Sequence, residues 1–177
     1  MSRSGAGESV VYLQPGECLL TSEPLRVVTV LGSCLAVTFH DPVSGLSAMC
    51  HAVFPHRRSR GRFGDHDSPY RFVDEAVARL LERLEGHGVP RSRLEVKVFG
   101  GAEAQALGLR SNPAQAVGRL NVKAAFDAMQ ARGLAVLTSD VGGRRGRTLV
   151  FSTCTGEVLL KRQPSEEGRQ APGGGIR

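Results

Sequence analysis

Residues 25–40 read LRVVTVLGSCLAVTFH, and the fold can be built outward from them. Two runs rich in β-branched and aromatic residues flank a glycine-serine break, so we predict one strand over 25–31 and a second over 34–40. The cluster DPVSG at 41–45 is typical of a turn, and a third strand is predicted over 47–54. The second and third strands are therefore expected to form a hairpin.

Alternation along this hairpin sorts its side chains between two faces. If the turn is centred on Pro42-Val43, residues whose numbers sum to 85 lie opposite each other, and Cys34 directly faces His51. A slip of one residue would put the two on opposite faces, whereas a slip of two would leave a diagonal pair on one face. The other face is expected to be core, with Cys50 packing there beside Leu35, Val37 and Phe39.

Cys34 and His51 are the candidate nucleophile and base. A cysteine attacks an acyl carbon as its thiolate, so it needs a neighbouring group that takes its proton and a backbone that leaves the sulfur accessible. Gly32 and Ser33 can supply that open backbone. From these residues alone a buried structural cysteine and a structural histidine remain strong alternatives. We expect no metal and no cofactor, because the usual zinc-ligand spacing is missing from the available set, Cys50, His51, His56 and His66.

Helices and strands alternate through the rest of the chain. Hydrophobic periodicity predicts two helices, over 69–86 with Ser68 as N-cap and over 113–132, and further strands over 94–99, 134–138, 147–152 and 157–161. This order is typical of a mixed α/β domain. We expect the domain to span 1–162 and to be followed by a disordered tail over 163–177, where apolar residues are scarce. The long polar loop over 57–69 could cover the site.

Charge and composition narrow the function classes. The 177-residue chain carries a formal charge of +6, and much of the excess lies in loops at 57–62 and 144–147. These loops either attract an anionic partner, such as nucleic acid or an acidic protein surface, or form a merely solvated basic face. Nucleic-acid binding is disfavoured, because only Phe63 and Tyr70 offer stacking aromatics near the first loop. No apolar run approaches the roughly 20 residues of a membrane span, and residues 1–8 lack a signal-peptide core, so we expect a cytoplasmic protein with reduced cysteines.

Several motifs occur in one order along the chain: LGSCLAV at 31–37, DP at 41–42, HAVFP at 51–55, FGGA at 99–102 and DVGGRRGR at 140–147. In these the sequence resembles the CheD family of chemoreceptor glutamine deamidases, over about Cys18 to Arg162. The resemblance implies a single-domain three-layer sandwich with a mixed β-sheet and flanking helices, similar to bacterial toxin deamidases.

The resemblance also implies an activity. Such a protein-glutamine glutaminase converts selected glutamines in the cytoplasmic domains of methyl-accepting chemotaxis receptors to glutamates and releases ammonia. Its Cys, His and Thr triad would correspond to Cys34, His51 and Thr29. We expect backbone N–H groups of the turn at Gly32 and Ser33 to stabilise the oxyanion.

A second function class stays open at this stage. The resemblance allows a binding protein that engages chemoreceptors and a CheC-type phosphatase with little or no deamidase activity. The chain also departs from a common Gly-x-Arg-Asn pattern at Gly118-Arg119-Leu120-Asn121, so a contact made by that arginine is missing or is supplied by Arg119. The sequence does not name the glutamines chosen, the regulatory signal or the oligomeric state.

Overall fold

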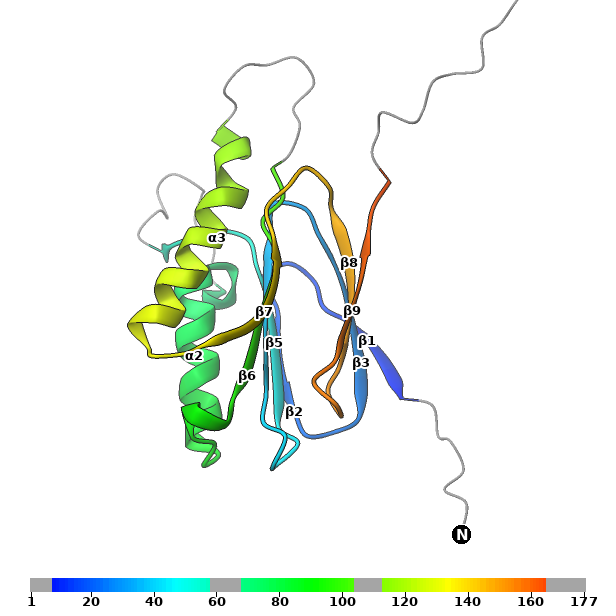
Figure 1. Ribbon diagram of the computed structural model, residues 1–177, viewed down its shortest axis with the longest axis vertical. Coiled ribbons are helices and arrows are strands. Elements are labelled where there is room, and N and C mark those ends of the chain that lie inside the picture. Colours follow the sequence, from blue (N-terminus) through cyan, green and yellow to red (C-terminus); the bar gives the residue numbers. More distant parts are fainter. Residues whose placement is uncertain (1–7, 58–67, 104–112, 165–177) are drawn as a thin grey trace, which may run out of the picture.

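The computed structural model describes residues 8–57, 68–103 and 113–164, which form three layers (Figure 1). Two helices, α2 (Val73–Gly86) and α3 (Pro113–Ala131), form the first layer. The middle layer is a five-stranded sheet in the order β2 (Cys18–Thr21), β5 (Ser47–Ala52), β4 (Leu35–His40), β6 (Glu95–Gly100) and β7 (Val136–Val141). The outer layer is a four-stranded sheet in the order β1 (Ser9–Tyr12), β3 (Leu25–Leu31), β8 (Arg147–Ser152) and β9 (Val158–Arg162).

Both sheets are mixed. β1 pairs with β3 in parallel and β6 with β7 in parallel, and the remaining pairs are antiparallel. The predicted mixed, three-layer architecture is confirmed, with two of the layers being sheets and both helices lying on one side. The likeness to bacterial toxin deamidases and the domain limits stay predictions. Residues 165–177 of the predicted tail and 58–67 of the predicted loop lie outside the described residues.

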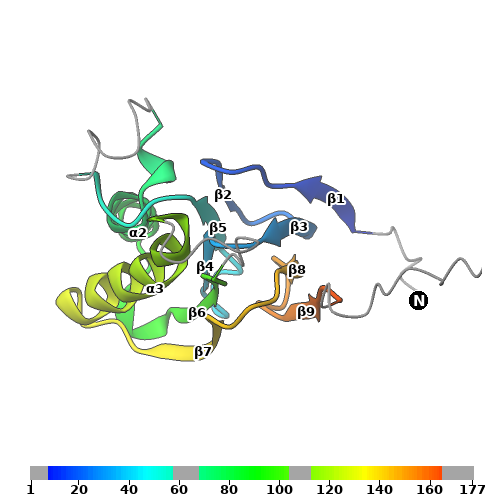
Figure 2. The ribbon, with the colours of Figure 1, turned by 90° about the horizontal axis from the view of Figure 1, so that it is seen from above.

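The strands β4 and β5 of the middle sheet are buried on both faces, and this places the site. Viewed from above, β4 and β5 lie between the helices and the outer strands β3 and β8 (Figure 2). One face of β4 and β5 packs against the helices through Leu35, Val37, Phe39, Ala48, Cys50 and Ala52. The opposite face packs against the outer sheet through Ala36 and Met49, which meet Val27, Leu31, Leu149 and Phe151. The expected core face is confirmed, and the second face is a core as well.

Helix α2 buries the periodic set that predicted it, Val73, Ala76, Val77, Leu80, Leu81 and Leu84. Its start differs from the prediction. Pro69–Arg71 forms a 3₁₀ turn, and the α-helix begins only after Phe72, which is extended. Ser68 caps nothing, because its hydroxyl donates to the carbonyl of Gly16 at 2.8 Å. The Arg71 carbonyl accepts hydrogen bonds from the N–H groups of Val53 and Phe54, which fixes the helix start to the end of β5.

The later helices and strands lie close to their predicted limits, whereas the sequence did not predict the two early strands β1 and β2. α3, β6, β8 and β9 lie within one residue of their predicted limits, and β7 begins two residues later than predicted. β1 and β2 are four residues each, too short for alternation alone to distinguish them from loop.

The predicted hairpin register is wrong by two residues. β4 pairs with β5 so that Ala36 faces His51 and His40 faces Ser47, which makes opposed numbers sum to 87. The connection holds four residues, 42–45, and is closed by the Asp41 N–H donating to the Leu46 carbonyl at 2.9 Å. The prediction assumed a two-residue turn, and the longer loop moves the centre of the hairpin by one residue along the chain.

Asp41 is the reason for the longer loop. Its buried carboxylate accepts hydrogen bonds from the Val43 N–H at 3.2 Å and from the Ser44 hydroxyl at 2.6 Å. Arg93 binds the same carboxylate with two nitrogens, at 3.1 and 2.6 Å. Gly45, at a φ of 73°, completes the loop in a conformation that favours glycine. The aspartate therefore holds the turn and joins it to the segment before β6.

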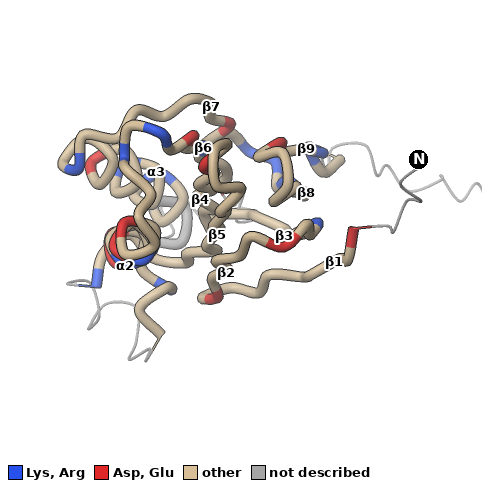
Figure 3. The backbone as a smooth tube through the Cα atoms, turned by 90° about the horizontal axis from the view of Figure 1, so that it is seen from below, with Lys and Arg blue, Asp and Glu red and all other residues tan. Residues whose placement is uncertain are grey.

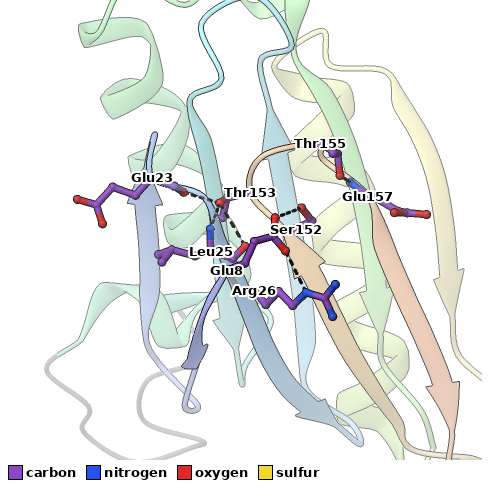
Figure 4. A network of polar contacts seen from close by, with 8 residues as sticks. All are labelled: Glu8, Glu23, Leu25, Arg26, Ser152, Thr153, Thr155 and Glu157. Carbon is purple, nitrogen blue, oxygen red and sulfur yellow. Dashed lines mark hydrogen bonds and ion pairs between the residues drawn. The ribbon is translucent and has the colours of Figure 1, made fainter. Parts of the chain in front are cut away.

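A second polar cluster joins the outer strands at one end of the sheet (Figure 4). The hydroxyl of Thr153 donates to the Glu23 carbonyl at 2.6 Å and accepts from the Leu25 N–H at 2.8 Å. The carbonyl of Thr153 accepts a hydrogen bond from Ser47 Oγ of the middle sheet at 2.7 Å. Thr153 therefore connects the two sheets at the end remote from the β3–β4 connection.

Asp41 should make the free energy of unfolding depend on pH in the acidic range. Burial acts to raise the pKa of this carboxyl, but the hydrogen bonds from Ser44 and Arg93 outweigh it and lower the pKa to about 2. Because the pKa of this carboxyl is lower in the folded protein than in the unfolded chain, its ionisation stabilises the fold. This contribution to the free energy of unfolding is complete above the unfolded-chain pKa of about 4 and is lost as the pH falls towards 2. In urea unfolding, the difference between wild type and Asp41→Asn should therefore shrink between about pH 5 and pH 2. The exposed Asp127→Asn is the control, and a constant difference would contradict this role.

Candidate active site

The segment Gly32–Cys34 crosses from β3 in the outer sheet to β4 in the middle sheet. Its carbonyls are held from outside: the Gly32 carbonyl accepts from the Ala102 N–H and the Cys34 carbonyl from the Gly101 N–H, both at 2.8 Å. Gly100 lies at a φ of 114°, and a Cβ there would come within 2.3 Å of the Cys34 carbonyl oxygen. Gly100 and Gly101 of the FGGA motif thus lie in close backbone contact with the cysteine loop.

Asn121 supplies a second hold on this loop. Its side chain projects from α3, is fully buried, and donates from Nδ2 to the carbonyls of Ser33 and Val53, each at 2.9 Å. One amide therefore links the residue before Cys34 to the end of the histidine strand. A Cβ at Gly118 would lie 2.4 Å from the Ala102 carbonyl, so that glycine lets α3 approach.

Sequence reasoning considered this helical segment only for its arginine. The signal for Asn121 was present, because it lies on the buried face of α3, between Val117 and Ala124.

His51 lies on the face of β5 that meets the outer sheet and is 2% exposed. Its Nδ1 is 2.8 Å from Thr29 Oγ1, and that hydroxyl donates to the carbonyl of Leu13 at 2.8 Å. A hydroxyl has one hydrogen, so Thr29 Oγ1 accepts from an Nδ1–H. We therefore assign the neutral tautomer with its lone pair on Nε2, an atom that is buried without a hydrogen-bond partner among the described residues.

Cys34 shares this inter-sheet face. It immediately precedes β4 and is partly buried against the inter-sheet core. Because Ala36 is the residue opposite His51, Cys34 lies on the diagonal from the histidine rather than directly across from it. The direct opposition predicted from the sequence is wrong, and the shared face is retained because the slip was an even number of residues.

Burial sets the charge state of the pair. It raises the pKa of the Cys34 thiol, an effect that the guanidinium of Arg71 partly opposes. Burial also lowers the pKa of His51, and the nearby Leu13 carbonyl partly offsets this effect. The free protein therefore holds a neutral thiol and a neutral imidazole. Deprotonation of the sulfur then depends on a base that is itself unprotonated near neutral pH.

Arg71 is a site residue that sequence reasoning missed. Its side chain passes so close to Gly16 that a Cβ there would lie 2.6 Å from Arg71 Cγ, and the Gly16 N–H donates to the His51 carbonyl. Its Nε is buried without a partner among the described residues. Only tertiary contact reveals this cation, because 37 residues separate it from Cys34 along the chain.

The other candidate groups are separated from this site. Cys50 is fully buried on the helix side of β5, where burial raises the pKa of its thiol to about 12, and its predicted packing role is confirmed. The zinc alternative would need Cys50 and His51 together, but they occupy opposite faces, and His66 lies outside the described residues. No helix in the described ranges is both long and apolar enough to cross a membrane.

Comparison with known proteins identifies relatives across most of the chain. The family model "CheD chemotactic sensory transduction" matches residues 54–162. A protein of Geobacter sulfurreducens named "Probable chemoreceptor glutamine deamidase CheD 2" is 44% identical, covering 86% of this chain and 89% of its own length. Proteins named "Probable chemoreceptor glutamine deamidase CheD" from Maridesulfovibrio salexigens and Pseudomonas syringae pv. tomato are 40% and 34% identical, covering 86% and 93% of this chain and 91% and 95% of their own lengths. The chain belongs to the CheD family.

The charge state of Cys34 can be tested by its reactivity. The pH dependence of iodoacetamide alkylation, mapped by mass spectrometry, should give Cys34 a pKa above the ordinary cysteine value, because burial disfavours the thiolate. Arg71→Gln removes the opposing cation, so the pKa should rise further and alkylation near neutral pH should slow severalfold. Arg79→Gln, on the exposed side of α2, is the matched control. A thiol pKa below the ordinary value, or equal curves for Arg71→Gln and Arg79→Gln, would refute this electrostatic description.

Proposed function

We propose that Cys34, His51 and Thr29 are the catalytic triad with which this CheD family member hydrolyses glutamine side-chain amides of chemoreceptors. The chain is accordingly a hydrolase acting on side-chain amides. The observation that carries the residue assignment is the Leu13–Thr29–His51 hydrogen-bond chain, which leaves Nε2 unprotonated on the face that carries Cys34. A triad needs this arrangement, in which a third group orients the base.

The first half-reaction forms a thioester. His51 Nε2 removes the proton from Cys34 Sγ as the sulfur attacks the glutamine Cδ, and the carbonyl electron pair moves onto oxygen. When the oxyanion collapses, the C–N bond breaks and Nε2–H gives its proton to the leaving nitrogen, which departs as ammonia. Thr29 Oγ1 keeps accepting from Nδ1–H throughout, so the imidazolium that forms transiently stays oriented.

The second half-reaction releases glutamate. Neutral His51 removes a proton from water as that water attacks the thioester carbon, and collapse of the new oxyanion breaks the C–S bond. The thiolate then regains its proton from Nε2–H. One glutamine and one water thus yield one glutamate and one ammonia, and Cys34 and His51 return to their neutral forms.

The peptide N–H groups around Gly32 and Ser33 are our candidates for stabilising the oxyanion. The carbonyls of Gly32, Ser33 and Cys34 each accept a hydrogen bond from a neighbouring element, so the intervening peptide planes have fixed orientations. Preorganised donors of this kind stabilise a developing negative charge without reorganising during the reaction. Asn121 thereby acts as a positioning residue for the turn.

The family resemblance supports the choice of partners. We infer that the substrates are cytoplasmic domains of methyl-accepting chemotaxis receptors and that the protein acts in the cytoplasm. A CheC-type phosphatase is a second proposed partner, on the same resemblance alone.

The test is deamidation of a purified receptor cytoplasmic fragment. The reaction is measured by the ammonia released and by mass shifts of about one dalton at individual glutamines. Cys34→Ala should abolish activity while the fold is kept. Thr29→Val should lower kcat strongly, because Nδ1–H loses its acceptor, whereas Thr29→Ser should retain most activity. Cys154→Ala, an exposed cysteine, is the control. Persistent activity in Cys34→Ala would exclude the assigned nucleophile, and equal activity in Thr29→Val and Thr29→Ser would exclude the triad threonine.

A further inference from the structure

A basic cavity lies beside the cysteine loop and takes no part in the chemistry above. It has a volume of about 530 Å³ and is lined by the β7–β8 connection and the end of β9. Four arginines and one carboxylate contribute to its wall, Arg144, Arg145, Arg147, Arg162 and Asp140, which leaves a net charge of +3. Figure 3 shows Lys and Arg positions near β8 and β9 and along the helices, whereas β4 and β5 carry none.

The cavity is built around a buried cation. Arg147 is 3% exposed, and its Nη2 donates to the Gly142 carbonyl at 2.7 Å and pairs with Asp140 at 2.9 Å. Its Nε and Nη1 are buried without hydrogen-bond partners among the described residues. Asp140 is shared with Arg162. One carboxylate therefore serves two guanidinium groups, and the cavity keeps an excess of positive charge that an anionic group would neutralise.

Backbone contacts place this cavity next to the nucleophile. The connections between β3 and β4 and between β7 and β8 cross between the sheets at the same end of the molecule (Figure 1). The Gly142 N–H donates to the Gly100 carbonyl, and Gly143 accepts from the N–H of Glu103. Gly100 and Gly101 in turn contact the carbonyl of Cys34. These contacts place the cavity wall two backbone hydrogen bonds from the cysteine loop, within reach of a protein chain that presents a glutamine to Cys34.

We propose that this cavity is a substrate-binding site that receives carboxylate side chains flanking the target glutamine on the receptor segment. The proposal rests on the proposed function for its substrate. The exposed Arg144 and Arg145 would contact the carboxylates, whereas Arg147 and Arg162 hold the wall through Asp140. A site of this kind would favour glutamines with acidic neighbours and would act on binding, because it lies outside the reacting groups.

The experiment compares two substrates and two charge-matched enzymes. The substrates are a receptor cytoplasmic fragment and the same fragment with the glutamates within three helical turns of the modified glutamine replaced by alanine. The enzymes are Arg144→Gln/Arg145→Gln and the control Arg79→Gln/Arg83→Gln, which loses the same charge from the exposed side of α2. We expect Arg144→Gln/Arg145→Gln to raise KM about fivefold to tenfold with kcat unchanged, and only for the fragment that keeps its glutamates.

Binding measured without turnover separates this proposal from the proposed function. Each arginine pair is also changed in the Cys34→Ala background, and the dissociation constant for the unreacted fragment is measured by fluorescence anisotropy at two salt concentrations. If Arg144→Gln/Arg145→Gln has a larger dissociation constant than the control, and one that changes less with salt, the site is supported even if no deamidation is found. The same KM and dissociation constant as in the control, or an equal loss for both fragments, would overturn it. So would phosphate that binds the cavity without competing with the fragment, because the site would then serve a free anion.

Discussion

The hydrogen bond between Thr29 Oγ1 and His51 Nδ1 joins the outer sheet to the middle sheet at the point where the proposed chemistry occurs. Its polarity follows from a third group, the Leu13 carbonyl, which takes the only hydrogen of the hydroxyl. The histidine then has one possible neutral tautomer in this environment, and its free lone pair lies on Nε2. The Leu13 carbonyl thus orients the proposed base through the Thr29 hydroxyl.

Packing of the sandwich sets the energetics of that site. Because β4 and β5 are buried on both faces, a thiol and an imidazole placed between the sheets lose hydration. This loss disfavours the charged form of each group, the thiolate and the imidazolium. The cysteine loop can enter this region only where backbone approaches closely, which Gly100 and Gly118 permit. Burial and glycine placement together explain why a neutral pair, rather than a preformed ion pair, occupies the site.

Much of this arrangement could be predicted from the sequence, and the failures have physical causes. Strand parity placed Cys34 and His51 on one face, because the side-chain period of two survives any even slip. The register itself failed, since the side chain of Asp41 holds a four-residue loop that composition alone does not reveal. Thr29 came from the family resemblance, and its contact with His51 depends on how the two sheets face each other.

Arg71, Asn121 and Leu13 could not be placed from the sequence. Each acts through a tertiary contact whose partner lies in a distant segment: Gly16 for the arginine, two loop carbonyls for the asparagine and the Thr29 hydroxyl for the leucine carbonyl. Local periodicity reports which face a residue occupies, but it carries no information about which segment packs against that face. Arg71 and Leu13 therefore support the site without belonging to any motif, and the pattern that contains Asn121 does not indicate what its side chain contacts.

The tautomer of His51 is the most direct test of this account. In the free protein labelled with ¹⁵N-histidine, at a pH where the imidazole is neutral, long-range ¹H–¹⁵N correlation spectra distinguish a protonated from an unprotonated ring nitrogen. We predict a protonated Nδ1 and an unprotonated Nε2 for His51, and loss of this preference in Thr29→Val. A protonated Nε2 in the wild-type protein would contradict it, because His51 could then not remove the proton from Cys34.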